Sequence, residues 1–254
     1  MPFFNHQGLR FSTVALGMMV LPAYAQDAKS DFTPQQQDEI REIVRDYILQ
    51  NPDIILESVA IMQARKKAEE DALAKAALVD KRDALERNPD DPVLGNPDGT
   101  VTLVEFFDYQ CGYCKSMLGP LQAMLKDNSD VRVVMKEFPI LGDASVIAAR
   151  ASLAADRQGR YLEFHTALLN YRGRLNEQVI MQVANEAGLD MKQLVKDMNS
   201  GEVQAQISQT YELAKALSIE GTPAFTIDGQ LIPGAVNHDQ LVALIESARK
   251  SASN

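Results

Sequence analysis

The chain has 254 residues, of which 46% are apolar and 24% are charged. This length and composition are typical of a globular protein with one or two domains, and they exclude a fibrous or intrinsically disordered chain. The formal net charge is −10 at pH 7. Nucleic-acid binding requires clustered Lys and Arg that contact phosphates, so we expect no nucleic-acid partner.

The first 25 residues have the pattern of a secretory signal peptide. Arg10 is the only charged residue among the first 26, an apolar run follows at 11–21, and small residues occupy positions Ala23 and Ala25. The apolar run is shorter than the ~20 residues that a membrane span needs. We therefore predict export, with cleavage after Ala25.

Residues 26–90 are predicted to form a helical region. Thr33-Pro34 and Asn51-Pro52 each combine an N-cap residue with a proline at the first helical position. The second start predicts one helix from Pro52 to about Arg87, which would be ~54 Å long. After the first start, apolar residues recur at helical spacing, at Ile40, Ile43, Val44, Tyr47 and Ile48.

The long predicted helix has too few apolar residues to be a core helix. Two alternatives remain: a solvated stalk, or a helix that contacts its counterpart in an oligomer. The second is favoured because a long isolated helix is poorly stable in water, and it predicts a dimer or trimer held together by residues 26–90. The segment Asn88–Gly99 is rich in proline and glycine and predicts a linker before a second domain at 91–254.

The periodicity changes in this second domain. Val101–Phe107 and Val131–Phe138 are rich in β-branched and aromatic residues and predict strands, and Cys114–Lys126 predicts a helix between them. This order is typical of a parallel strand pair. The remaining expected elements are helices over about 142–217, a strand at Pro223–Ile227, a turn at Asp228-Gly229, a strand at Leu231-Ile232 and a helix at His238–Lys250.

Cys111 and Cys114 are the only cysteines of the chain. At the start of a helix, backbone N–H groups stabilise the thiolate of the first cysteine, so the pKa of Cys111 should lie below the ~8.5 of a free thiol. Cys114 lies one turn further on, where it could close a disulfide or resolve a mixed disulfide. The spacing therefore predicts a redox-active pair.

Three other uses of the cysteine pair are weaker. A structural disulfide across so few residues would contribute only about 2 kcal/mol. A zinc site needs four ligands, and the mature chain adds only His165 and His238, which are distant in sequence and which we interpret as structural. Capture of Cu(I) by the two thiolates stays open as a side activity. We expect no resident metal and no other cofactor.

The residues around the cysteines resemble a known family. The stretch Glu105–Lys115 resembles the active site of thioredoxin-fold proteins of the DsbA type, and Gly221–Phe225 resembles the loop of that fold in which a cis-proline, here Pro223, faces the cysteines. The resemblance covers about Pro92–Lys250. It implies an α/β protein with a thioredoxin fold and a helical insertion (DsbA-like), preceded here by an N-terminal helical extension.

The same resemblance implies roles for individual residues. Cys111 would attack a substrate disulfide, and Cys114 would resolve the mixed disulfide. Glu105 would be the partly buried acid that accepts a proton from Cys114, and burial should raise its pKa. The residues expected to contact the substrate are Gly112, Tyr113, Thr222 and Pro223, with Tyr109 and Met117 lining the peptide-binding surface.

The dipeptide Gly112-Tyr113 and the residue Thr222 resemble bacterial disulfide isomerases of the DsbC type. A helical extension before a DsbA-like domain resembles the ScsC (suppressor of copper sensitivity) proteins, some of which are trimers. These resemblances imply an oligomeric periplasmic isomerase or reductase of misfolded exported proteins with cysteines, kept reduced by a membrane thiol reductase. The alternatives are a monomeric DsbA-like dithiol oxidase and a copper-binding or chaperone module.

Overall fold

The computed structural model describes residues 32–252, so the predicted signal peptide lies outside the described residues. The chain forms two compact units, and the division between them falls between Ala60 and Ile61. Over the described range, no helix combines the length and the apolar character that crossing a bilayer requires. The ten helices of this range are α1 (Pro34–Gln50), α2 (Asp53–Asp80), α3 (Arg82–Glu86), α4 (Gly112–Asp127), α5 (Asp143–Asp156), α6 (Tyr161–Asn170), α7 (Glu177–Glu186), α8 (Met191–Met198), α9 (Gly201–Ala216) and α10 (His238–Ala252).

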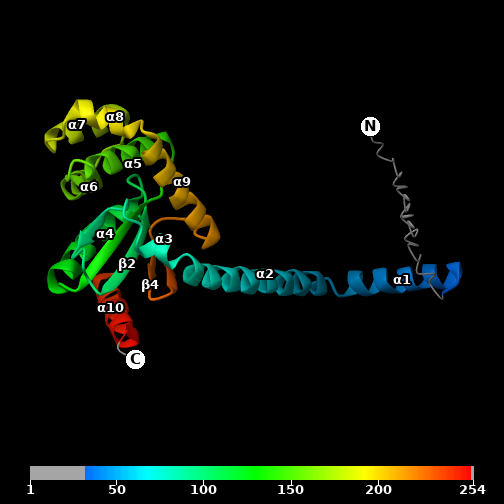
Figure 1. Cartoon of the computed structure of the whole chain (residues 1–254). Helices are drawn as coiled ribbons and strands as arrows, with labels where there is room; N and C mark the ends of the chain where they lie inside the picture. The colour runs from blue at the N-terminus through cyan, green and yellow to red at the C-terminus, as the bar shows by residue number, and fades with distance from the viewer. Residues whose placement is uncertain (1–31, 253–254) are drawn as a thin grey trace, which may run out of the picture. The chain divides into compact units, whose positions relative to one another are not determined.

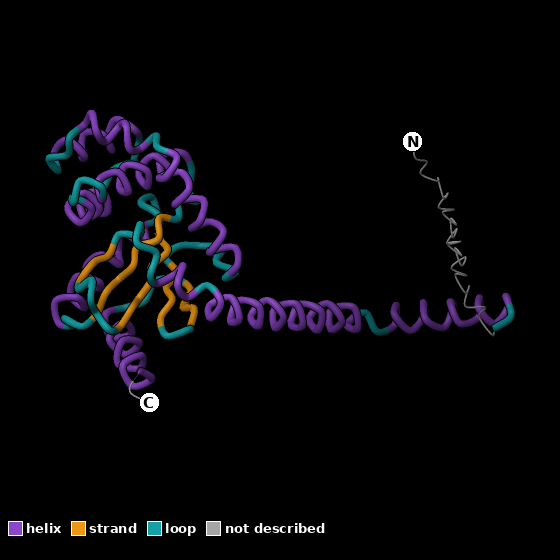
Figure 2. Tube along the Cα trace, viewed as in Figure 1, coloured by secondary structure: helices purple, strands orange, loops and turns teal. Residues whose placement is uncertain are grey.

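The first unit contains α1 and the start of α2, joined by a short loop at the predicted Asn51-Pro52 break (Figure 2). The predicted cap of α1 is confirmed: the Thr33 hydroxyl accepts from the Gln36 N–H, and the Gln36 side chain accepts from the Thr33 N–H at 2.9 Å. Within the single chain no α1 residue is buried. The apolar residues of this helix are therefore in water, with Ile43 67% exposed and Tyr47 59% exposed.

The second unit begins with the rest of α2, which differs from the prediction. The predicted single helix to Arg87 is wrong: α2 ends at Asp80, and the short α3 follows after Lys81. The segment was predicted to be too poor in apolar residues for a core helix, yet Leu78 and Leu85 are buried against strand residues of the second unit. They lie seven residues apart, in α2 and α3, and both helices therefore pack against the second unit.

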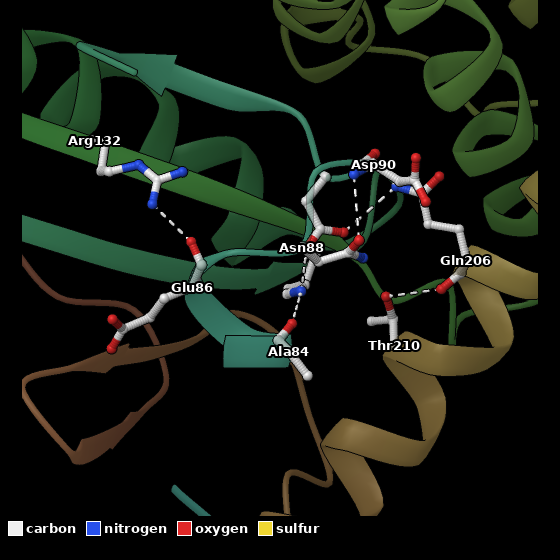
Figure 3. Close-up of polar contacts among 9 residues, drawn as sticks. Ala84, Glu86, Asn88, Asp90, Arg132, Gln206 and Thr210 are labelled. Atoms are coloured by element: carbon white, nitrogen blue, oxygen red, sulfur yellow. Dashed lines mark hydrogen bonds and ion pairs between the residues drawn. The ribbon is translucent and has the colours of Figure 1, made fainter. Parts of the chain in front are cut away.

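Hydrogen bonds and an ion pair also hold residues 84–91 against the second unit (Figure 3). Arg132 donates to the carbonyl of Glu86 at 2.7 Å, and Lys136 donates to the carbonyl of Ala84 at 2.7 Å. Lys136 is buried and also forms an ion pair with the buried Asp91. On the other side, Gln206 of α9 donates to the carbonyl of Asp90 at 2.5 Å and to the Asp91 carboxylate. The segment from 84 to 91 is thus held by the sheet and by α9.

One mixed sheet forms the centre of the second unit (Figure 2). Its order is β1-β3-β2-β4-β5, with β2 parallel to β3 and the other pairs antiparallel. The predicted linker is corrected here, because β1 lies inside it and the Met135 N–H donates to the Pro92 carbonyl. The strands are β1 (Val93–Gly95), β2 (Val101–Phe107), β3 (Val131–Glu137), β4 (Ala224–Ile227) and β5 (Gln230–Pro233).

The predicted hairpin between β4 and β5 is confirmed. Asp228 and Gly229 both have positive φ, +48° and +69°. Two successive residues of this kind form the turn whose twist matches that of a two-residue β-hairpin. The hairpin makes β5 an edge strand of the sheet.

Helices cover both faces of the sheet. α4 and α10 pack on one face, and α3 and α9 pack on the other. Successive β2 side chains alternate between these faces: Leu103 and Phe107 belong to the first core, and Val104 and Phe106 belong to the second. Glu105 has the same parity as Leu103 and Phe107, so its side chain points toward the α4 face.

The expected helical insertion is present between β3 and β4. It is built around α5, which packs against α6, α7, α8 and α9 (Figure 1). α6 also packs against α4, so the insertion covers the helix that carries the cysteines. The architecture confirms the α/β fold with a helical insertion that the resemblance implied.

Candidate active site

Cys111 is the N-cap residue of α4, directly after the turn that leaves β2. Its backbone is extended, and its sulfur accepts a hydrogen bond from the Cys114 N–H at 3.5 Å. The Cys111 N–H donates to the Asp108 carbonyl at 3.1 Å. The first cysteine therefore meets the free N–H groups of the first helical turn, as its position in the sequence predicted.

The turn before Cys111 is fixed by the buried carboxylate of Asp108. One oxygen accepts from the Gln110 N–H at 2.7 Å and from the Ser145 hydroxyl at 2.7 Å, and the other accepts from the Leu141 N–H at 2.9 Å. Leu141 and Ser145 lie at the entry to α5, so one side chain joins the active-site turn to the insertion. Asp108 was not predicted from the sequence. An Asp after a strand is nevertheless a known turn signal, because its carboxylate can accept a hydrogen bond from the backbone N–H two residues later.

The predicted cis-proline is confirmed, because the Thr222-Pro223 peptide bond is cis. The Cys111 sulfur lies 3.2 Å from the Thr222 carbonyl oxygen, across a sequence separation of 111 residues, and donates to it when Cys111 is protonated. Gly112 and Tyr113 lie on the surface beside this contact, and Tyr113 is 71% exposed. The structure thus places Gly112, Tyr113 and Thr222 around Cys111 with their side chains or backbone at least partly exposed, whereas Pro223 is buried. Contact of these four residues with substrate remains a prediction.

The two thiols differ strongly in acidity. Hydrogen bonds lower the pKa of Cys111 from 9.0 to about 5, and the largest contribution comes from the Cys114 thiol, ahead of Thr222 and the backbone N–H groups. Burial, followed by the hydrogen bond to Cys111, raises the pKa of Cys114 well above its usual value. At neutral pH Cys111 is a thiolate and Cys114 keeps its proton, which is the asymmetry that a nucleophile and a resolving thiol require.

Glu105 lies behind the cysteines and is only 2% exposed. Burial raises its pKa from 4.5 to about 8, and the negative charge of Cys111 contributes in the same direction. Glu105 and Cys114 line the same cavity of about 380 Å³, whose walls are mostly apolar side chains of α4 and α6. A carboxyl group with a pKa near neutrality can take up or release a proton during the reaction, as predicted for Glu105.

The expected roles of Tyr109 and Met117 at a peptide-binding surface are wrong. Both are 1% exposed and belong to the core. The Tyr109 hydroxyl donates to Glu137 at 3.1 Å and shares a hydrogen bond of 3.0 Å with His165 Nδ1. Burial lowers the pKa of His165 to about 3, so this imidazole is neutral and its interpretation as a structural residue fits its position.

The described residues offer few side chains that could bind a metal ion together. Among residues 32–252, no three His, Cys, Asp or Glu side chains gather into a group that could hold a metal ion. The two sulfurs alone suit a soft, low-coordinate ion such as Cu(I). Cu(I) binding therefore remains a prediction that rests on Cys111 and Cys114.

Comparison with known proteins agrees with this geometry. Residues 102–246 match the model of the DSBA-like thioredoxin domain, and residues 36–69 match that of the copper resistance protein ScsC N-terminal domain. A thioredoxin-like oxidoreductase from Silicibacter pomeroyi DSS-3 is 47% identical, with a TM-score of 0.65, over 66% of this chain and 98% of that protein. Proteus mirabilis ScsC in a transitional conformation is 30% identical, with a TM-score of 0.65, over 85% of this chain and 98% of that one.

Two further proteins are similar to this chain, the second of them over only part of its own length. A periplasmic thioredoxin-like protein from Salmonella enterica serovar Typhimurium is 31% identical, with a TM-score of 0.60, over 66% of this chain and 94% of that one. The Na(+)/H(+) antiporter NhaA 3 of Salinispora tropica is 30% identical over 65% of this chain, which spans only 26% of the antiporter. Ion transport therefore does not follow from that match. The chain belongs to the DsbA-like thioredoxin-domain family of thiol-disulfide oxidoreductases.

Proposed function

We propose that the protein is an oligomeric periplasmic disulfide isomerase or reductase that acts on misfolded exported proteins. The observation that carries the proposal is the apolar stripe of α1, which the single chain leaves in water although it is attached to a thiol-disulfide catalytic unit. Such a stripe is stable when it packs against its counterpart in a second or third copy. Several active sites held together gain avidity for one client.

The reaction begins with the thiolate of Cys111. It attacks one sulfur of a client disulfide, forms a mixed disulfide and releases the other client sulfur as a thiolate. If a client thiolate then displaces Cys111, the client is isomerised and no electrons are exchanged in total. If Cys114 attacks instead, the ionised form of Glu105 accepts its proton, the Cys111–Cys114 disulfide forms and the client is reduced by two electrons. A membrane thiol reductase would then restore the dithiol.

Periplasmic location is part of the proposal. It is supported by the signal-peptide pattern of the first 25 residues and by the periplasmic relative from Salmonella. The oxidising environment outside the cytoplasm is also where client proteins carry disulfides.

A monomeric dithiol oxidase is the second candidate. The pKa of Cys111, near 5, favours it, because a stabilised thiolate stabilises the reduced enzyme and makes its disulfide a stronger oxidant. The match of residues 36–69 to a copper-resistance family keeps a copper-binding or chaperone function as a third candidate.

Ribonuclease with scrambled disulfides distinguishes these functions. We expect the reduced protein to reactivate it, Cys111→Ser to abolish the activity, and Cys114→Ser to keep part of it, because isomerisation requires only the first thiol. Rapid oxidation of reduced ribonuclease with little reactivation of the scrambled form would favour the oxidase. Suppression of client aggregation that survives both substitutions, without thiol turnover, would favour the chaperone. Cu(I) binding lost with either substitution, again without turnover, would favour the copper module.

A further inference from the structure

A surface groove of the second unit begins at the cis-proline loop and continues toward α2. Its first part, about 300 Å³, is lined by the loop around Thr222 and by β5. Its second part, about 580 Å³, lies between α2 and the β4–β5 hairpin. The two parts share Ser218, Glu220, Leu231 and Pro233, so they adjoin one another along β5 and the segment before Thr222. We call the two parts together the α2 groove.

One face of α2 forms the outer wall of the α2 groove. Lys67, Asp71, Ala74 and Leu78 line it and recur every three or four residues, which places them on one side of the helix. Ala74 and Leu78 are buried, and Leu78 packs in the core beneath the sheet. This wall is therefore held against the second unit by apolar contacts near the end of α2.

The edge strand β5 forms the opposite wall. β5 pairs with β4 on one side only, as the strand order requires. The backbone groups of an edge strand can pair with an added extended chain, and such pairing depends little on the sequence of that chain. Lys67 and Glu220 bring charges of both signs to the same groove, so it does not select clients of one charge.

We propose that the α2 groove binds an extended segment of the client polypeptide next to the cysteine that Cys111 attacks. The inference rests on the proposed function. The α2 groove begins beside the reactive cysteine, because Thr222 lines its first part and the Thr222 carbonyl lies 3.2 Å from the Cys111 sulfur. A client joined to Cys111 by a disulfide must pass this loop. The second helix of the extension thus belongs to the client-binding surface of the catalytic unit.

A peptide trapped on Cys111 tests the groove. The probe is a peptide of about 12 residues, up to ~40 Å when extended, with one terminal cysteine activated as its mixed disulfide with thionitrobenzoate. In the full-length Cys114→Ser protein, attack by Cys111 joins the peptide and releases coloured thionitrobenzoate, so trapping is measured separately. A photoreactive p-benzoylphenylalanine replaces Asp71 or Gln230 in the groove. The matched controls replace Glu69, which faces away from the groove on α2, and Asp228 at the hairpin tip.

We expect cross-linking of the trapped peptide from Asp71 and Gln230 to exceed that from Glu69 and Asp228 at least about tenfold, which corresponds to 1.4 kcal/mol of preference. Normal thionitrobenzoate release with equal cross-linking at all four positions would overturn the groove and leave the thiol chemistry intact. Cross-links from Asp71 to a second copy of the chain would also overturn it, since another protomer would then fill the groove. Absence of thionitrobenzoate release would overturn both the proposed function and this inference.

Discussion

The two ends of the helical extension use apolar side chains in opposite ways. In α1 the apolar residues form a stripe that the single chain leaves exposed, and no α1 residue is buried. At the other end, Leu78 and Leu85 are buried in a core, and Lys136 and Arg132 hold the carbonyls of the same segment. The end near the catalytic unit is therefore packed within one chain, whereas the apolar residues of α1 would be buried only in the proposed oligomer.

The buried ion pair gives the largest expected effect. We expect Lys136→Met to lower the free energy of unfolding by about 3–5 kcal/mol, because it leaves the buried Asp91 carboxylate without its partner. Urea denaturation of the reduced protein measures the change. The control is Lys66→Met, whose 3.6 Å pair with Glu70 is exposed and should contribute about 0–1 kcal/mol. Equal losses of unfolding free energy in both variants would show that the buried Lys136–Asp91 pair stabilises the protein no more than the exposed Lys66–Glu70 pair of α2.

A smaller effect concerns pH, because Glu105 of the catalytic unit is a buried carboxyl group, whereas no residue of α1 is buried. The folded pKa of about 8 lies above the unfolded value of 4.5, so this contribution to stability is fully present below pH 4.5 and is lost as the pH rises through 8. His165, whose pKa is lowered from 6.5 to about 3, still titrates in the unfolded state near pH 6.5, but it contributes equally to the protein and to its Glu105→Gln variant and cancels in their comparison. Cys111, whose pKa is lowered, acts in the opposite direction, and this effect disappears in the oxidised protein.

We therefore expect the oxidised protein to lose more stability between pH 6.5 and 8 than its Glu105→Gln variant, by up to about 1–2 kcal/mol, because burial, the larger cause of the raised pKa, persists when the Cys111 charge is absent. Thermal and urea unfolding at the two pH values measure the difference. Glu42→Gln on the exposed surface of α1 is the control and should leave the pH dependence unchanged. A Glu105→Gln variant with the wild-type slope would mean that Glu105 is ionised throughout this range.

The smallest effect on stability is expected in α1. Ile43→Asp should change the unfolding of the catalytic unit by less than about 0.5 kcal/mol, because Ile43 is 67% exposed. It should nevertheless dissociate the oligomer, which sedimentation or light scattering would detect. Arg45→Asp on the opposite face of α1 is the control and should leave the mass unchanged. A wild-type protein that is monomeric at all concentrations would contradict the proposed use of the α1 stripe.

The catalytic unit was predictable from sequence because its signals are local. The β-branched strand at 101–107, the positive-φ pair Asp228-Gly229 and the cysteines at a helix start each depend on a few neighbouring residues. The cis-proline was predictable only through family resemblance. β1 was missed because three residues between prolines carry no periodicity, and its pairing with β3 decides it.

The contribution of the segment 74–91 to the core was missed for a different reason. Leu78 and Leu85 become buried only because β2, β3 and α9 supply their partners. Conversely, this segment supplies the partners of the buried Lys136 of β3, namely the Ala84 carbonyl and Asp91. A buried lysine cannot be inferred from composition, since lysine in a helical or strand segment is usually exposed. Tyr109 was misplaced similarly, because its hydroxyl finds Glu137 and His165, which lie far along the chain.

The Asp108 contacts also bear on which substitutions this family can accept. Two of the three donors to its carboxylate are the backbone N–H groups of Gln110 and Leu141, and every residue type except proline supplies a backbone N–H. The side chains at 110 and 141 can therefore vary without loss of these two hydrogen bonds. The hydroxyl of Ser145 is the one donor of the three that a side chain supplies, and the Gln110 side chain adds hydrogen bonds of 3.0 Å to this hydroxyl and to the Leu141 carbonyl. The insertion can thus diverge widely in sequence while the turn that carries Cys111 keeps its shape.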